Sequence, residues 1–219
     1  MRRIGWPIVA AIALGILHGT EVARTQPAER ALPRPTSSDG PGVWTVIASR
    51  RSERTFGARS LSEQELGQLL WAAQGMLDGH RTVPSAGALY PLRVQLVDAR
   101  GSWRYEPGRH ALVSEGSGDR RADLSAAAWR QSSVRDAAAT LVICGELAVV
   151  AAKYTTRNAE RFATLEAGHA AQNVLLAATA LDLAAVPIGA FDEREVRRVL
   201  ALGDRRTPLY LIAIGPRAR

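Results

Sequence analysis

Three short segments contain residue types and spacings that are suited to chemistry. The first, RRSER from Arg50 to Arg54, holds three arginines and a serine within five positions. Guanidinium groups bind a phosphate through paired hydrogen bonds, and a serine hydroxyl adds another donor. The same pattern also fits an exposed helix end whose arginines are solvated, because such residues are common on protein surfaces.

The other two segments combine small residues with proline. PSAGALYP, from Pro84 to Pro91, has a stiff backbone that lacks bulk where a flat ligand could approach, although it also fits an ordinary loop between a helix and a strand. VPIGAFD, from Val186 to Asp192, places the N–H groups of Gly189 and Ala190 just before a helix N-terminus, where partial positive charge collects. By spacing alone it too fits a simple turn.

Lys153 is the only lysine among 28 basic residues, and Tyr154 follows it. A lysine, unlike an arginine, can lose its proton near neutral pH in suitable surroundings. Two other interpretations remain open: the lysine is left over in an arginine-rich composition, or it extends to solvent from a helix end while Tyr154 packs in the core.

Composition excludes several classes of protein and site. The single cysteine, Cys144, rules out an intramolecular disulfide and a multi-cysteine metal site, and we expect it to be a buried apolar residue. His169 lacks metal-binding partners, so we expect a packed or interface histidine and no metal. The net charge of +7 is scattered and aromatic residues make up 5%, which argues against a nucleic-acid partner.

The chain of 219 residues divides into three parts. Residues 1–23 have a basic head and an apolar run typical of a signal peptide, with an uncleaved membrane anchor or a buried N-terminal helix as alternatives. We therefore expect export to the periplasm or another extracytoplasmic space, with membrane contact only through this segment. Residues 24–42 are proline-rich and predict a disordered linker. Residues 43–219 form the folded domain.

Helical segments outnumber short strands in this domain, which favours an α+β class. Ser62 and Glu65 form a capping box before a helix that ends near Gly75. The alanine-rich segment 158–183 predicts a long buried central helix. Further helices are expected at 123–129 and 192–202, and strands at 93–98, 103–105, 140–144 and 209–214.

These segments together resemble the nitroreductase family of FMN enzymes, and within it the SagB-type dehydrogenases. The resemblance covers most of residues 44–215 and is carried by RRSERTF, LSEQELGQLLWAAQG, TVPSAGALYPLRVQLV, KYTTRNAERFATLEAGHAAQNVLLAATAL, VPIGAFD and TPLYLIAIG. It implies a nitroreductase-like fold, with a short central, mostly antiparallel sheet flanked by helices. It also implies an obligate homodimer with two FMN sites at its interface.

The resemblance implies a role for each segment. Arg50 takes the FMN phosphate, and Arg54 takes the N1/C2=O edge of the flavin, where reduced flavin gathers negative charge. The segment around Ser85 lies against the isoalloxazine, partly from the partner subunit, and the segment around Gly189 lines the other face with an N–H toward N5. Arg217 belongs to the phosphate site. The implied FMN-binding set is Arg50, Arg51, Ser52, Arg54, Pro84, Ser85, Ala86, Gly87, Leu89, Pro187, Ile188, Gly189, Ala190, Arg217 and Arg219.

Lys153 and Tyr154 match a Lys-Tyr pair that SagB-type azoline dehydrogenases place near the flavin. Removing a hydride and a proton from an azoline ring requires a base, and a desolvated lysine beside a phenol suits that role. We therefore expect both residues to be catalytic, acting on a small-molecule or peptide substrate with O₂ as electron acceptor. The alternatives are an NAD(P)H-dependent nitro or quinone reductase and an exported flavin-binding protein without turnover. The short segment 110–135 and the short C-terminal arm depart from relatives and leave the substrate open.

Overall fold

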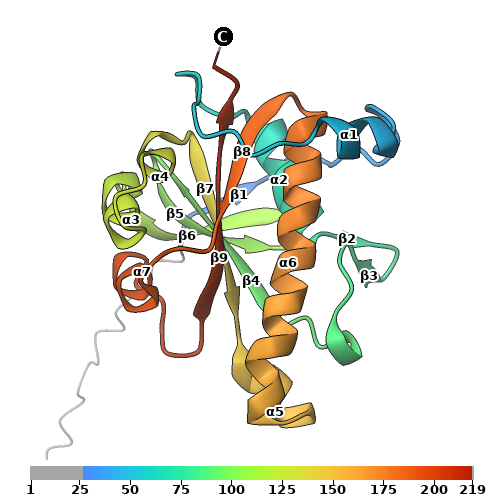
Figure 1. Ribbon diagram of the computed structural model, residues 1–219. Helices are drawn as coiled ribbons and strands as arrows, with labels where there is room; N and C mark the ends of the chain where they lie inside the picture. Colours follow the sequence, from blue (N-terminus) through green and yellow to red (C-terminus); the bar gives the residue numbers. More distant parts are fainter. Residues whose placement is uncertain (1–26, 219) are drawn as a thin grey trace, which may run out of the picture.

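The computed structural model describes residues 27–218, in which a seven-stranded sheet is the central layer (Figure 1). Its strand order is β1-β6-β5-β4-β7-β9-β8, and every neighbouring pair is antiparallel. The strands are β1 Glu29–Ala31, β4 Leu92–Asp98, β5 Gly101–Glu106, β6 Ala111–Ser117, β7 Ala139–Gly145, β8 Leu183–Ile188 and β9 Thr207–Pro216. A separate hairpin consists of β2 Met76–Leu77 and β3 His80–Arg81.

Helices cover both faces of the sheet (Figure 1). The helices are α1 Val43–Ser49, α2 Glu63–Gln74, α3 Arg121–Ala127, α4 Ser132–Asp136, α5 Leu147–Lys153, α6 Thr156–Ala180 and α7 Glu193–Val199. Helices α2 and α6 pack on one face, and α3, α4 and α7 pack on the other. The α+β class, the antiparallel sheet and the long central helix expected from the sequence are confirmed.

Alternation along the central strands builds a separate core on each side of the sheet. In β7, Leu141 and Ile143 join the core beneath α6, whereas Val142 and Cys144 join the core beneath α3 and α7. Because successive side chains of a strand point to opposite faces, a strand covered on both sides is apolar throughout. This explains the uninterrupted apolar run of β7 and confirms that Cys144 is buried.

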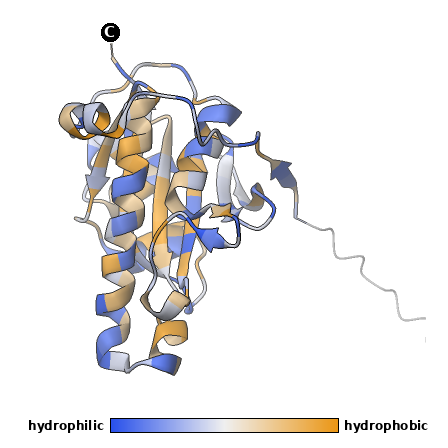
Figure 2. Ribbon diagram, turned by 90° about the vertical axis from the view of Figure 1, so that its right-hand side faces the viewer, coloured by the Kyte–Doolittle hydropathy of each residue, from blue (hydrophilic) through white to orange (hydrophobic). Residues whose placement is uncertain are grey.

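The sequence signals fix the helix boundaries well. The Ser62 hydroxyl accepts a hydrogen bond from the Glu65 N–H, and the Glu65 side chain accepts one from the Ser62 N–H, so the expected capping box is present at the start of α2. Thr155 caps α6 through the Asn158 N–H. Figure 2 shows both hydrophobic and hydrophilic segments along α6, which buries alanines against the sheet and exposes polar residues.

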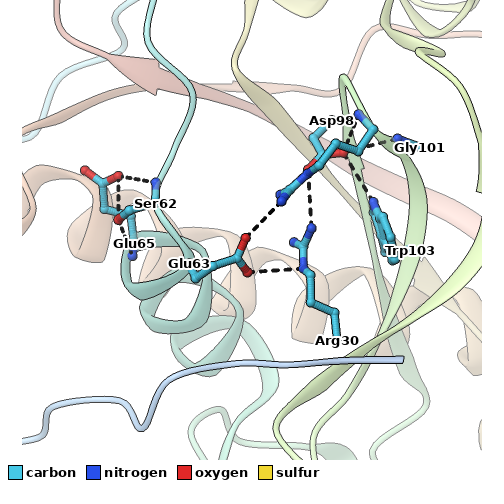
Figure 3. Close-up of polar contacts among 8 residues, drawn as sticks. Arg30, Ser62, Glu63, Glu65, Asp98, Gly101 and Trp103 are labelled. Carbon is cyan, nitrogen blue, oxygen red and sulfur yellow. Dashed lines mark hydrogen bonds and ion pairs between the residues drawn. The ribbon is translucent and has the colours of Figure 1, made fainter. Parts of the chain in front are cut away.

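Residues 27–42 differ from the expected linker. Glu29–Ala31 forms β1 and pairs with β6, and Leu32 is buried. Arg30 lies over the Trp103 ring at 4.7 Å and forms ion pairs with Glu63 at 3.1 Å and Asp98 at 3.8 Å (Figure 3). Its partners lie on α2 and on β4, so the segment is an arm that docks on the domain. Composition alone could not show this, because the partners are distant in sequence.

The arm is also held by a histidine. The Nε2 atom of His110 lies 2.9 Å from the Pro33 carbonyl oxygen, and its Nδ1 atom lies 2.8 Å from the Tyr105 hydroxyl. Burial lowers the pKa of His110, and its contact with Pro33 partly offsets this effect. The neutral ring can donate to the carbonyl and accept from the phenol, so it joins the arm to the end of β5.

Several elements escaped sequence analysis. The segment around Val186, expected to be a turn, is strand β8, and nine strands outnumber seven α-helices among the described residues. Small residues such as Ala184 and Ala185 concealed this strand. No helix within residues 27–218 is long and apolar enough to cross a membrane. The expected signal peptide or anchor, residues 1–23, and Arg219 lie outside the described part of the chain.

Candidate functional site

The Arg50–Arg54 segment follows α1 and is attached to the edge of the sheet. The Glu53 N–H donates to the Ala185 carbonyl of β8 at 3.0 Å. Three residues on, Phe56 forms an isolated bridge with Arg217 just beyond β9. These contacts place Arg51, Ser52 and Arg54 at the surface and Arg50 in a half-buried position.

Arg217 neutralises the acidic residues beside this segment. Its guanidinium lies 2.6 Å from Glu53 and 2.8 Å from Asp182, whereas Arg51 lies 3.5 Å from Glu53. Arg50 and Arg54 have no ion-pair partner within residues 27–218. The cluster therefore carries four guanidinium groups against two carboxylates, a surplus of positive charge that is suited to a phosphate.

The turn after β8, at the opposite end of this strand from Asp182, presents free backbone donors. Gly189 and Ala190 are exposed, and neither N–H has a hydrogen-bond partner among residues 27–218. The Ala190 carbonyl accepts a bond from Gln131 at 2.9 Å, which fixes the orientation of this turn. The Ile188 side chain is 3% exposed and packs in the core, so this position offers a ligand its backbone rather than its side chain.

The Pro84–Tyr90 segment, which precedes β4, adopts a strained backbone. Its residues Gly87, Ala88 and Tyr90 have φ values of 60°, 55° and 48°, a region that L side chains rarely occupy. The Ser85 hydroxyl oxygen accepts a hydrogen bond from the Tyr90 N–H at 2.9 Å and closes the loop. Strained conformations of this kind cluster at ligand-binding sites.

Lys153 and Tyr154, at the end of α5, meet this segment. The Lys153 Nζ atom donates to the Gly87 carbonyl at 3.3 Å. A Cβ atom built on Gly87 would lie 2.7 Å from both Lys153 Nζ and the Tyr154 hydroxyl, so any other residue there would have to displace these two side-chain ends. Tyr154 is 37% exposed and packs edge-on against Phe162, which excludes the alternative in which it is a core residue. Lys153 is also exposed, so a single chain does not desolvate it.

A polar group that sequence analysis missed lies beneath the Pro84–Tyr90 segment. Glu166 of α6 is 3% exposed, and the Gln74 amide lies 3.5 Å from its carboxylate. Glu166, His169 and Ser85 line a cavity of about 280 Å³ together with Pro84, Ala86, Phe162 and Leu165. His169 is exposed, so it is not packed within its own chain. The sequence does contain a signal for Glu166, because it is a charged residue among the alanines that form the buried face of α6.

The two groups of residues lie at different ends of α6 (Figures 1 and 2). The Arg50–Arg54 segment and the start of β8 lie near its C-terminal end, where Asp182 contacts Arg217. The Pro84–Tyr90 segment lies beside its N-terminal half, where Phe162 and Glu166 are located. One chain thus carries two half-sites that are separate from each other.

Comparison with known proteins identifies this arrangement. Residues 47–216 match the model of the nitroreductase family. The chain belongs to the nitroreductase family. The nitroreductase homologue MJ1384 of Methanocaldococcus jannaschii is 36% identical over 179 residues, which cover 78% of this chain and 88% of the relative.

Solved structures of nitroreductase homologues have the same fold. One from Ralstonia eutropha has a TM-score of 0.79 at 26% identity and covers 89% of this chain and 94% of its own. One from Anabaena variabilis has a TM-score of 0.77 at 24% identity, and the match covers 87% of this chain and 42% of the Anabaena chain. The NADPH:FMN oxidoreductase of Vibrio harveyi in complex with NAD+ has a TM-score of 0.62 at 22% identity. The match covers 81% of this chain and 69% of the Vibrio chain, and it supports the fold alone.

Membership of the nitroreductase family makes the protein an oxidoreductase and implies a flavin cofactor. The residues present fit such a group. The surplus guanidinium groups around Arg50 suit a phosphate, and the exposed turn at Gly189 leaves open space, because a Cβ there would meet only Tyr210 at 3.9 Å.

Proposed function

We propose that the protein is an FMN-dependent dehydrogenase of the SagB type, which oxidises an azoline-like ring in a small molecule or peptide. The observation that carries the proposal is the meeting of Lys153 and Tyr154 with Gly87, because it brings a base and a phenol to the flavin-facing segment. FMN supplies the hydride acceptor, at its N5 atom. The substrate loses that hydride together with one proton, and Lys153 takes the proton from carbon.

Each half-site has a defined task in this proposal. Arg50 and Arg51, with Ser52, hold the phosphate end of FMN, and Arg217 keeps Glu53 from competing for them. Arg54 would bind the N1/C2=O edge, and the Gly189 and Ala190 N–H groups would be donors for N5. Pro84, Ser85, Ala86, Gly87 and Leu89 cover the isoalloxazine, with Pro187 and Ile188 supporting the opposite turn.

We further propose that two copies of the chain assemble the site. The half-sites lie at different ends of α6 in one chain, so an FMN held near Arg50 needs the Pro84–Tyr90 segment from a partner. Val43, Trp44 and Ile47 of α1 are 57%, 80% and 49% exposed, which leaves apolar area for such a partner to bury. A partner would also exclude water from Lys153.

An NAD(P)H-dependent nitro or quinone reductase is the second candidate. The Vibrio harveyi neighbour is an NADPH:FMN oxidoreductase whose structure contains NAD+, so a protein of this fold can accept a nicotinamide nucleotide. Export of the protein, which we propose from residues 1–23, favours the dehydrogenase with O₂ as acceptor, because pyridine nucleotides are scarce outside the cytoplasm. A flavin-binding protein without turnover is the third candidate.

The spectrum of the full chain loaded with FMN tests these candidates. Without oxygen, the flavin band should persist after addition of NADPH or NADH and bleach after addition of an azoline peptide. Rapid bleaching by NAD(P)H would instead identify a reductase, and failure to bind FMN would refute the proposal. Lys153→Ala should retain FMN and slow bleaching by the peptide at least about 100-fold, within the range of general base catalysis. Unchanged bleaching would remove Lys153 from the mechanism.

A further inference from the structure

Glu166 is a buried carboxylate that the chemistry proposed above does not use. It lies on the stripe of α6 that faces the core, between Ala163 and Ala170, which are 0% exposed. An isolated carboxylate is costly to bury, so a group in this position needs hydrogen-bond donors. Its donors connect it to the flavin-facing segment.

Contacts on both sides of one cavity bring this segment close to Glu166. The Tyr90 N–H donates to the Ser85 hydroxyl oxygen at 2.9 Å, and Ser85 lines the same cavity as Glu166. Gln74 of α2 contributes its amide to Glu166 at 3.5 Å. Because a hydroxyl has a single proton, donating it to Glu166 would direct the oxygen lone pairs of Ser85 toward Tyr90.

We propose that Glu166 is a positioning residue whose carboxylate orients the Ser85 hydroxyl and thereby holds the Pro84–Tyr90 segment in its strained, ligand-facing conformation. The left-handed backbone of Ala88 and Tyr90 persists only where the surroundings impose it, and the hydrogen bond from Tyr90 to Ser85 closes the loop that contains both. The link to flavin binding rests on the function proposed above; the positioning of Ser85 by Glu166 does not.

The charges around Glu166 determine how its effect depends on pH. Burial raises its pKa, while Ser85, Gln74 and the Arg81 guanidinium act in the opposite direction. Arg81, from β3, donates to the Gln74 carbonyl at 2.9 Å and lies 5.6 Å from the Tyr90 ring, so it braces the same loop. Beyond Arg81 lie Arg93 and Tyr105, and His169 faces the cavity from the next turn of α6.

The protonation state of Glu166 should change how strongly it holds Ser85. As the pH falls through the raised pKa of Glu166, the carboxylate takes up a proton and becomes a weaker acceptor for Ser85. The hold of the Glu166 carboxylate on the Ser85 hydroxyl should therefore weaken toward acidic pH. A glutamine in this position cannot titrate and should respond to pH only through the other groups.

Hydrogen exchange of the Tyr90 amide in the full, flavin-free chain tests the proposal. Glu166→Leu should accelerate exchange about tenfold, the loss expected for a hydrogen bond to a charged group. Glu166→Gln should give an intermediate rate, because an amide oxygen can still accept from Ser85. Glu160→Gln, an exposed glutamate on the same helix, is the matched control and should exchange like the wild type.

The pH dependence separates positioning from simple packing. The difference in exchange between the wild type and Glu166→Gln should close as the pH falls, because protonated Glu166 resembles the amide. In a parallel FMN titration, Glu166→Leu should raise the dissociation constant and Glu166→Gln should partly restore it. Unchanged Tyr90 exchange in Glu166→Leu, or a difference that does not vary with pH, would overturn the proposal. If the wild type binds no FMN, the proposed function is refuted. The exchange rate of the Tyr90 amide then still tests whether Glu166 positions the loop.

Discussion

Arg217 neutralises the two carboxylates that lie beside the Arg50–Arg54 segment. Without it, Arg51, 3.5 Å away, would be the remaining ion-pair partner of Glu53 among the described residues. The ion pairs of Arg217 with Glu53 and Asp182 occupy both carboxylates and leave Arg50 and Arg54 free among the described residues. The sequence predicted a phosphate-binding role for Arg217. The structure suggests an indirect contribution, in which Arg217 removes competing negative charge.

Arg50→Ala should weaken FMN binding about 10- to 100-fold, the loss expected when a charge-assisted pair to a phosphate is removed. Fluorescence quenching of FMN on titration with the protein measures the dissociation constant. Arg205→Ala, which removes an exposed arginine before β9, is the control for net charge. Retention of FMN at wild-type affinity by Arg50→Ala would contradict the assigned phosphate site.

At the scale of elements, the Pro84–Tyr90 loop depends on α5 for its shape. The carbonyl of Gly87 accepts from Lys153, and the space beside its Cα is filled by Lys153 and Tyr154. Loop and helix end therefore form one unit, in which a change of either displaces the other.

Gly87→Ala should lower turnover at least about tenfold by displacing Lys153 and Tyr154, because small misplacements of catalytic groups are costly. Gly118→Ala is a matched control: Gly118 also has a positive φ, 84°, but a Cβ there meets nothing within 4 Å. Both variants should lose about 1 kcal/mol of unfolding free energy from left-handed backbone strain. Urea unfolding and peptide oxidation measure the two effects. Equal turnover in the two variants would show that Lys153 and Tyr154 need no fixed place.

Local signals predicted the elements that carry them. The capping box of α2, the apolar run of β7 and the alanine-rich α6 were readable because their patterns are complete within a few residues. Strand β8 was missed because small residues and Pro187 conceal its alternation. Likewise, Glu166 and Arg81 escaped notice because their role depends on contacts between α2, β3 and α6. The separation of the two half-sites depends on the tertiary arrangement and has no local signal.

At the scale of the whole molecule, the N-terminal arm sets the true limit of the folded unit. β1 pairs with β6, Leu32 is 9% exposed, and Arg30 reaches Glu63 and Asp98. The arm covers one edge of the sheet, which otherwise would offer unpaired backbone groups to other chains. The folded unit thus begins before residue 43.

A chain that starts at residue 43 should be less stable than one that starts at residue 27. Removal of the arm exposes the pocket of Leu32 and the edge of β6, at a cost of about 2 kcal/mol or more for the apolar burial alone. Thermal unfolding should show a midpoint lower by roughly 5 °C or more for a chain of this size. Equal midpoints for the two chains would mean that the arm docks without stabilising the domain.

The position of β9 has a consequence for synthesis on the ribosome. Among the described strands it comes last along the sequence, yet it lies inside the sheet between β7 and β8. Until residues 207–216 have emerged, β7 lacks a neighbour on one side and β8 has none. The nascent chain cannot complete its sheet before then, and it must carry an unpaired β8 and one open edge of β7 through that interval. A truncation that removes residues 207–216 would make that transient state permanent.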